Sequence, residues 1–145
     1  MIATTDFARI GPWLAAEVEL DRAWEPHTNG IGWLRDGQIV AAVAFERYVP
    51  KVDVQLHCAG RFPRRAFAET FIHVFHTLGC RRATGLVSSK NRRALDFDLH
   101  LGFRLEGIVR RAGLDGSDIY VLGMLREECR FIHAPWTRVL EGVIA

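Results

Sequence analysis

The side chain of this chain best suited to accept a proton is His57, on the polar face of a predicted strand. Residues 52–58 read V-D-V-Q-L-H-C, and this alternation predicts a strand with one apolar and one polar face. The reference pKa of histidine, about 6.5, suits a general base near neutral pH. Asp53 on the same face and Glu46 on the preceding strand are weaker candidates. In the alternative interpretation, His57 is only hydrogen-bonded within the sheet.

Arginines gather where this strand gives way to a helix. A strand that ends at Gly60 and a helix that begins near Arg64 present free backbone N–H groups and the positive end of the helix dipole at one point. Arg61, Arg64 and Arg65 would add charge there, which suits a phosphate-bearing ligand. The alternative is that all three are solvated surface charges, because surface arginine is common.

The stretch from Leu78 to Phe103 contains the helix end, buried strand and second helix around which the other elements are arranged. Gly79 is expected to close a helix over residues 63–78, and residues 83–87 form an almost uncharged strand typical of burial on both faces. Asn91 ends a polar loop and is expected to cap a helix over residues 92–101. Gly102 would end that helix and Phe103 would begin the next strand.

The remaining elements complete one layered domain over residues 1–145. A first helix, with Thr5 and Asp6 as caps, is expected to about residue 20, and Asp36-Gly37 predicts a hairpin between two strands, 30–34 and 38–48. Strands are also expected over 103–110 and 119–125, with room for one more only at residues 1–4. This order predicts an α/β (α+β) domain with a single mixed, mainly antiparallel central sheet flanked by helices.

Composition restricts the class of protein. With 145 residues, 49% hydrophobic and 25% charged, the chain matches one soluble globular domain. No apolar run approaches the roughly 20 residues of a membrane helix, and no secretory signal is present. Three widely spaced cysteines predict free thiols and a cytoplasmic location. A net charge of only +2 argues against a nucleic-acid binder.

Two histidines have a spacing that could bind a metal ion. His73 and His76 are three residues apart on the predicted helix 63–78, opposite its apolar stripe. Neither a carboxylate nor a thiol partner is evident nearby, so both are expected to be solvated and no metal site is predicted.

Several motifs together resemble a known superfamily. L-G-C-R-R-x-T-x-x-V from Leu78 is followed by N-x-x-A-L-x-F from Asn91 and by H-L-G-F-x-x-E-G-x-x-R from His100. This order resembles the GCN5-related N-acetyltransferase (GNAT) superfamily, above all the branch that acetylates ribosomal-protein N-termini and short phage-borne members. The resemblance covers roughly residues 30–131 and implies the GNAT-type acyl-CoA N-acyltransferase fold.

The resemblance also implies a cofactor, a reaction and a set of site residues. Acetyl-CoA would give its acetyl group directly to a primary amine, with His57 as the general base. Its carrier arm would lie between strands 52–58 and 83–87, and the residues that would contact the cofactor are Leu56, Cys58, Gly60, Arg61, Arg64, Arg65, Asn91 and Ala94. The family's R-x-x-G-x-G/A signature is replaced here by H-C-A-G-R-F-P-R-R-A, and Asp98 stands where many members carry a tyrosine acid.

Two other functions remain open at this stage. The chain could be a catalytically weak or inactive module of the same fold that binds CoA or a protein partner, as the altered glycine loop and the missing tyrosine suggest. A nucleic-acid binder using the arginines is the least favoured hypothesis. The acceptor could be a protein N-terminus, a lysine or a small amine, and the chain could be a monomer or a homodimer.

Overall fold

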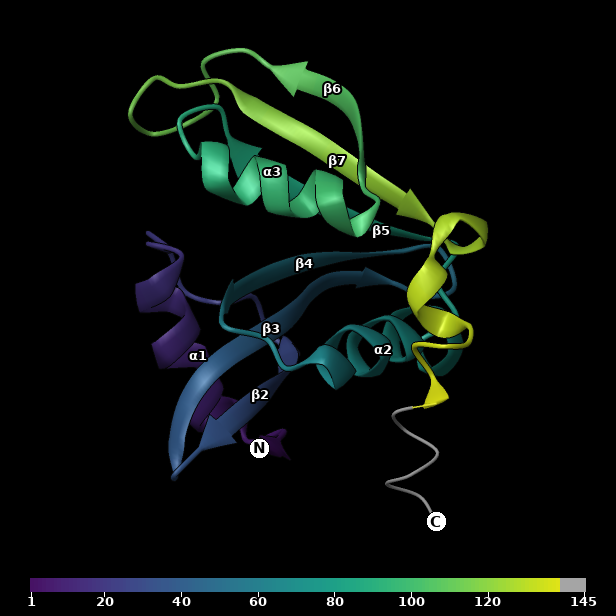
Figure 1. Ribbon diagram of the computed structural model, residues 1–145. Coiled ribbons are helices and arrows are strands. Elements are labelled where there is room, and N and C mark those ends of the chain that lie inside the picture. Colours follow the sequence, from purple (N-terminus) through teal and green to yellow (C-terminus); the bar gives the residue numbers. More distant parts are fainter. Residues whose placement is uncertain (139–145) are drawn as a thin grey trace.

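A single sheet of seven strands organises the computed structural model, which describes residues 1–138. The strand order is β1-β2-β3-β4-β5-β7-β6, and only β4 and β5 run parallel (Figure 1). The strands are β1 (Ile2–Thr4), β2 (Asn29–Arg35), β3 (Gln38–Val49), β4 (Asp53–Gly60), β5 (Arg82–Ser88), β6 (Arg104–Val109) and β7 (Ile119–Leu125). The mixed, mainly antiparallel sheet predicted from the sequence is therefore confirmed, including a short first strand in residues 1–4.

Local sequence explains the joins and helix ends near the sheet. Asp36 and Gly37 have φ angles of 52° and 79°, both positive, as a two-residue hairpin between β2 and β3 requires. Gly79 (φ 68°) and Gly102 (φ 114°) take the left-handed conformation at the two predicted helix ends. Asp6 is the N-cap residue of the first helix, although its side chain makes no capping hydrogen bond.

Helices cover both faces of the sheet. α1 (Phe7–Glu17) packs on one face of β2, β3 and β4, whereas α2 (Arg64–Ile72) and α3 (Arg92–Leu101) lie on the other face (Figure 1). α2 continues as a π-helical turn, η1 (His73–Thr77), so the predicted helix over 63–78 has a wider last turn. The short 3₁₀ turns η2 (Arg126–Glu128) and η3 (Arg130–Ile132) follow β7.

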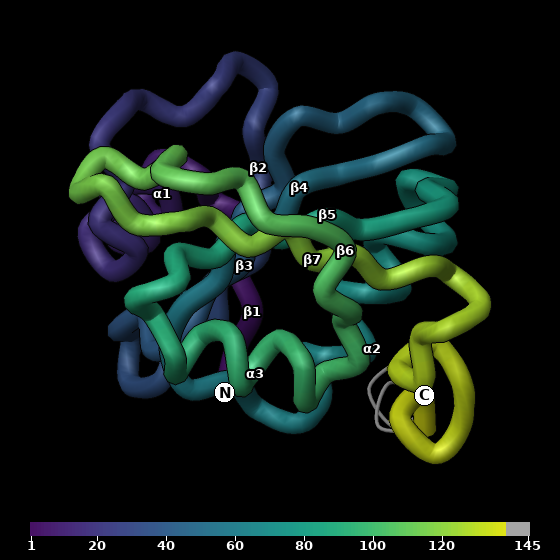
Figure 2. The backbone as a smooth tube through the Cα atoms, turned by 90° about the horizontal axis from the view of Figure 1, so that it is seen from above, coloured from purple at the N-terminus to yellow at the C-terminus, as the bar shows by residue number. Residues whose placement is uncertain are grey.

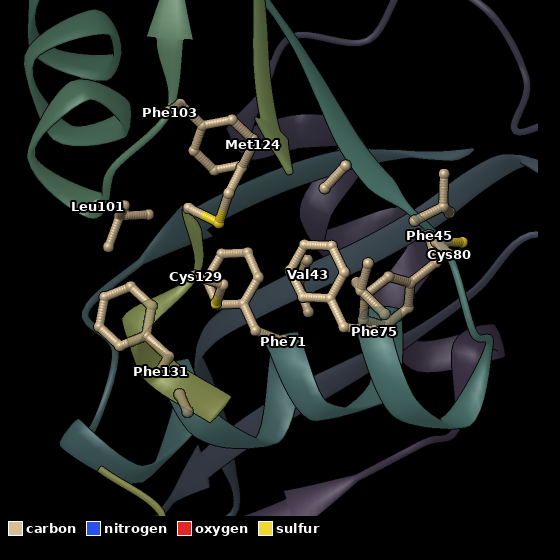
Figure 3. Packing of buried hydrophobic residues seen from close by; sticks show 14 of the residues in the cluster. Val43, Phe45, Phe71, Phe75, Cys80, Leu101, Phe103, Met124, Cys129 and Phe131 are labelled. Atoms are coloured by element: carbon tan, nitrogen blue, oxygen red, sulfur yellow. The ribbon is translucent and has the colours of Figure 1, made fainter. Parts of the chain in front are cut away.

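The main core lies between the sheet and α2. Figure 3 shows Phe71 of α2 and Phe75 of η1 directed toward Val43 of β3, with Phe103 and Phe131 beside them. The alternation of β3 divides the apolar side chains between the two faces: Val43 and Phe45 join this core, whereas Ala42 and Ala44 contact α1. Both faces of β3 are thus buried, which fixes the register of its neighbour β4.

The two parallel strands at the centre of the sheet scarcely pair. β4 is held by β3 from Ala41↔Gly60 to Glu46↔Gln55, and β5 is held by β7 along its whole length. Between β4 and β5, however, the pairing is limited to Gln55 with Thr84. The strands separate beyond that pair (Figure 1), so the sheet has an opening that begins at Leu56 on one side and Gly85 on the other.

The chain after η3 folds back on the molecule. Trp136 packs against Phe67 and Phe131, with ring centroids 5.8 and 4.7 Å apart, so this part of the C-terminal segment is bound within its own chain. No helix in residues 1–138 combines the length and apolar character that a membrane span needs.

Candidate active site at the opening between β4 and β5

A buried carboxylate anchors the polar side chains on the α1 face of the sheet. Glu46 accepts two hydrogen bonds from the guanidinium of Arg22, at 2.7 and 2.9 Å, and one from the backbone N–H of Glu25, at 3.0 Å. Arg22 and these hydrogen bonds lower the pKa of Glu46 to about 2, against the opposing effect of burial. Glu46 is therefore ionised at neutral pH, and the loop between α1 and β2 supplies its partners.

His57 is the second member of this cluster and lies at the edge of the opening. Its Nε2 is 3.0 Å from Glu46 Oε1, and its ring packs edge-on against Trp24 at 5.3 Å. Burial lowers the pKa of His57, while Glu46 acts in the opposite direction. Because ionised Glu46 can only accept, Nε2 carries the proton, and Nδ1 has no hydrogen-bond partner within residues 1–138. The ring is thus a neutral base with one free nitrogen.

Of the three residues predicted as bases, the structure brings two together. Glu46 contacts His57 directly and orients it, so Glu46 itself is occupied as an acceptor. Asp53, four residues before His57, accepts a 2.8 Å hydrogen bond from Thr84 and lies 3.6 Å from Arg82 Nε. Asp53 therefore belongs to a separate ion-pair network that joins β4 to β5.

A small apolar cavity lies on the opposite face of the same opening. Leu56 and Cys58 point into it because they alternate with His57 along β4. The cavity measures about 50 Å³, and its other walls include Phe62, Phe97 and Asp98. Phe62 stacks on Phe97 with the ring centroids 6.0 Å apart and fills much of the space between α2 and α3.

Asp98 is the residue that sequence reasoning undervalued. Its Oδ2 lies 3.8 Å from where a Cβ atom on Gly85 would be, and it makes no hydrogen bond or ion pair within residues 1–138. Burial raises the pKa of Asp98 to about 6. A signal for it exists in the sequence: Asp98 follows Ala94 by four residues and precedes Leu101 by three, so it interrupts the apolar stripe of α3 with a carboxyl group.

Cys58 lies in the same cavity but is chemically inert. Burial, followed by the nearby charge of Asp98, raises the pKa of the Cys58 thiol to about 12. A thiol must ionise to act as a nucleophile. Cys58 is therefore a wall residue of the cavity.

The turn after β4 keeps only part of its predicted positive charge free. Gly60 has a φ of 108°, and a side chain there would overlap the Val40 carbonyl, so glycine is required. Arg61 is exposed, and its side chain makes no hydrogen bond or ion pair within residues 1–138. Arg64 instead stacks on Trp136, 4.3 Å from the ring centroid, and Arg65 binds Glu69 and the Met1 carbonyl.

The other predicted cofactor contacts, Asn91 and Ala94, lie at the beginning of α3. Asn91 Oδ1 accepts a 3.1 Å hydrogen bond from the backbone of Ala94, which confirms its role as a helix cap. The expectation that His73 is solvated is wrong: it is half-buried 4.5 Å from the Phe45 ring, because the wider turn at the end of α2 directs it inward. Residues 1–138 contain no group of three His, Cys, Asp or Glu side chains that could hold a metal ion.

Comparison with known proteins identifies the fold. No family model and no curated protein matches this chain. Among solved structures, a chimera of the spermidine N-acetyltransferase of Vibrio cholerae with its human counterpart superimposes with a TM-score of 0.70 at 12% identity, over 88% of this chain and 98% of that one. An acetyltransferase described as putative from T. thermophilus gives 0.63 at 21% identity, over 91% and 72%.

A third solved structure carries the superfamily name that the motifs resemble. The GNAT-family acetyltransferase from Bacillus anthracis superimposes with a TM-score of 0.57 at 16% identity, over 70% of this chain and 67% of that one. At these identities the likeness shows the fold alone. The GNAT acyltransferase fold predicted from the sequence is thus confirmed, whereas the ribosomal-protein branch and the phage-borne members stay predictions.

Proposed function

We propose that this protein is an acetyl-CoA-dependent N-acetyltransferase that moves an acetyl group directly to a primary amine. The observation that carries the proposal is the opening between β4 and β5, which has a neutral histidine on one face and an apolar cavity on the other. Two reactants that enter from opposite faces can meet only there. Holding both in line is itself a large part of catalysis.

The thioester would enter from the cavity face. Leu56, Cys58 and the helix start at Asn91 and Ala94 would line its carrier arm, and the turn at Gly60 with Arg61 would receive its phosphates. A cavity of about 50 Å³ is too small for such an arm. Binding therefore requires the Phe62 ring to rotate out from between α2 and α3, and Arg64 would reach the phosphates only after leaving Trp136.

The chemistry follows from the two titratable groups that flank the opening. The amine nitrogen attacks the thioester carbonyl, and Nδ1 of His57 takes the proton that this nitrogen gives up. Backbone N–H groups of the separated strands can stabilise the oxyanion. When the C–S bond breaks, the sulfur leaves as a thiolate, and Asp98 in its protonated form can return a proton to it. Cys58 carries no acetyl group at any stage, because its thiol does not ionise.

A non-catalytic module is the second candidate, and specific contacts favour it. Arg64 and Arg65 are engaged by Trp136, Glu69 and the Met1 carbonyl. A protein that had lost acetyl transfer could keep this closed arrangement. It would bind coenzyme A weakly and would release no thiol with any amine.

The test combines binding, turnover and one variant. Calorimetry with desulfo-CoA measures binding, and a thiol-release assay with acetyl-CoA and a panel of primary amines measures transfer. We expect turnover, a loss of about 10²–10⁴-fold in kcat for His57→Gln, and no acetylated protein in the mass spectrum of the reaction. Binding without turnover on any amine would support the module, and an acetyl group trapped on Cys58 would exclude direct transfer.

The proposal also covers the cellular compartment and the oligomeric state of the protein. All three cysteines, Cys58, Cys80 and Cys129, are free thiols, which supports a reducing cytoplasm. We place the enzyme there as a monomer or homodimer whose acceptor is an amine-bearing protein or small molecule.

A further inference from the structure

On the α1 side of the sheet, β5, β7 and β6 present apolar side chains that no helix of residues 1–138 covers. Along β5, Gly85 and Val87 face α2 and α3, so Leu86 points to the opposite side. Leu86 is 44% exposed and pairs with Val121 of β7. Ile119, two residues before Val121 on the same strand, pairs with Val109 of β6. These four residues (Leu86, Val109, Ile119 and Val121) form what we call the apolar floor. Figure 2 shows α3 and α2 together on one side of these strands.

The apolar floor begins directly across the opening from the base. The parallel pair Gln55↔Thr84 sets the register of β4 against β5, and two residues further along each strand are His57 and Leu86. Both side chains point to the α1 face, since both lie an even number of residues from that pair. A molecule whose reactive nitrogen reaches His57 therefore lays the atoms next to that nitrogen on Leu86 and Val121.

Four carboxylates beside this face have cationic partners. Glu46 pairs with Arg22 at 2.7 Å, and Glu25 pairs with Arg47 at 3.0 Å. At the other end of the face, Arg82 bridges Glu106 at 2.6 Å and Asp53 at 3.6 Å. A second ammonium group on a substrate would thus lose water on the apolar floor, and each of these four carboxylates would have to leave its present partner to pair with it.

From this arrangement we infer that the acceptor is a primary amine on an apolar carbon skeleton without a second positive charge. The inference rests on the proposed function and narrows it. It separates this chain from the structural neighbours named as spermidine N-acetyltransferases, since spermidine is a polyamine. In this inference the residues on this face of the sheet determine which acceptor binds, and the fold that these proteins share does not.

A matched pair of substrates tests the inference. Hexylamine and hexamethylenediamine have the same carbon chain and differ by one terminal ammonium group. We expect kcat/KM for hexylamine to exceed that for the diamine by about tenfold or more, because only the diamine must desolvate a second charge. Leu86→Glu places an unpaired carboxylate on the apolar floor and should reduce this ratio by about tenfold, through a loss with hexylamine and a gain with the diamine.

The control places the same charge on the other face. Leu105 of β6 is 51% exposed and pairs with Leu122, whose side chain points into the core on the α2 side. Leu105 therefore lies on the face opposite to the apolar floor, and Leu105→Glu should leave the ratio of the two kcat/KM values unchanged. A wild-type preference for the diamine, or an equal effect of both variants, would overturn the inference while leaving acetyl transfer intact. Absence of transfer to every amine would instead contradict the proposed function, and this inference with it.

Discussion

The most informative single substitution is Asp98→Asn, because it should raise the free energy of unfolding and lower kcat at the same time. Asp98 is a half-buried carboxyl group without a partner in residues 1–138, and burial raises its pKa from 3.8 to about 6. A carboxyl group whose pKa is raised on folding costs stability increasingly as the pH rises from its unfolded pKa to its folded pKa, and the full cost applies above the folded pKa. A difference of about two pKa units corresponds to about 3 kcal/mol. Solvent access at the cavity reduces this cost, so we expect about 1–3 kcal/mol.

Denaturant unfolding at two pH values separates this effect from simple repacking. At about pH 8, Asp98→Asn should raise the free energy of unfolding by about 1–3 kcal/mol, and at about pH 4 the gain should disappear because the wild-type carboxyl is then neutral in the fold. Asp96→Asn is the matched control on the same helix: Asp96 is exposed and pairs with Arg92 at 3.2 Å, so its change should stay within about 0.5 kcal/mol at both pH values.

Turnover supplies the second measurement on the same variant. Asp98→Asn should lower kcat while leaving the affinity for coenzyme A nearly unchanged, since the carboxyl group acts when the thiolate leaves. A variant that is destabilised at about pH 8 would refute the reasoning, because Asp98 would then have an ionic partner in the folded protein. Unchanged turnover would show that Asp98 does not donate a proton in the reaction.

Three further predictions concern the neighbouring residues. Glu46→Gln should reduce the acid sensitivity that the Glu46 pKa of about 2 confers. Between about pH 4.5 and about pH 2, the loss of stability followed by circular dichroism should be smaller in the variant by up to about 3 kcal/mol, while Asp115, whose pKa is also lowered to about 2, contributes to the loss in both proteins. His57 has a lowered pKa, so the wild-type pH profile of kcat/KM should show no loss from His57 protonation until below about pH 6.5. Because protonation of the amine also lowers kcat/KM, the wild-type profile is compared with that of His57→Gln on the same amine, and an additional wild-type drop above that pH would mean that His57 is charged. Phe62→Ala should cost about 1–3 kcal/mol of stability yet tighten coenzyme A binding in calorimetry, and weaker binding by a folded variant would show that the ring supports the ligand.

Most of the fold was predictable because its signals are local. Asp36-Gly37 predicted a hairpin, and the alternation over residues 52–58 predicted which side chains of β4 face each side. Less could be said of the turn after α2: local propensity predicted one helix over residues 63–78, whereas His73–Thr77 form a wider turn and the His73 ring lies 4.5 Å from Phe45.

The candidate site was predictable in outline, and its contacts were not. The histidine and the turn at Gly60 follow from strand alternation and glycine chemistry, but the partners of Arg64 and Arg65 come from opposite ends of the chain, Trp136 and Met1. Long-range contacts of this kind leave no spacing signal in a sequence. Asp98 is the intermediate case, since a carboxyl group within an apolar stripe is visible in the sequence, whereas its lack of a partner is not.

The most direct measurement is a crystal structure of the protein with coenzyme A. We predict that the carrier arm lies between β4 and β5, with the sulfur between His57 and Asp98 and the Phe62 ring rotated away from Phe97. A structure in which coenzyme A binds elsewhere, while Phe62 still fills the space between α2 and α3, would contradict this prediction.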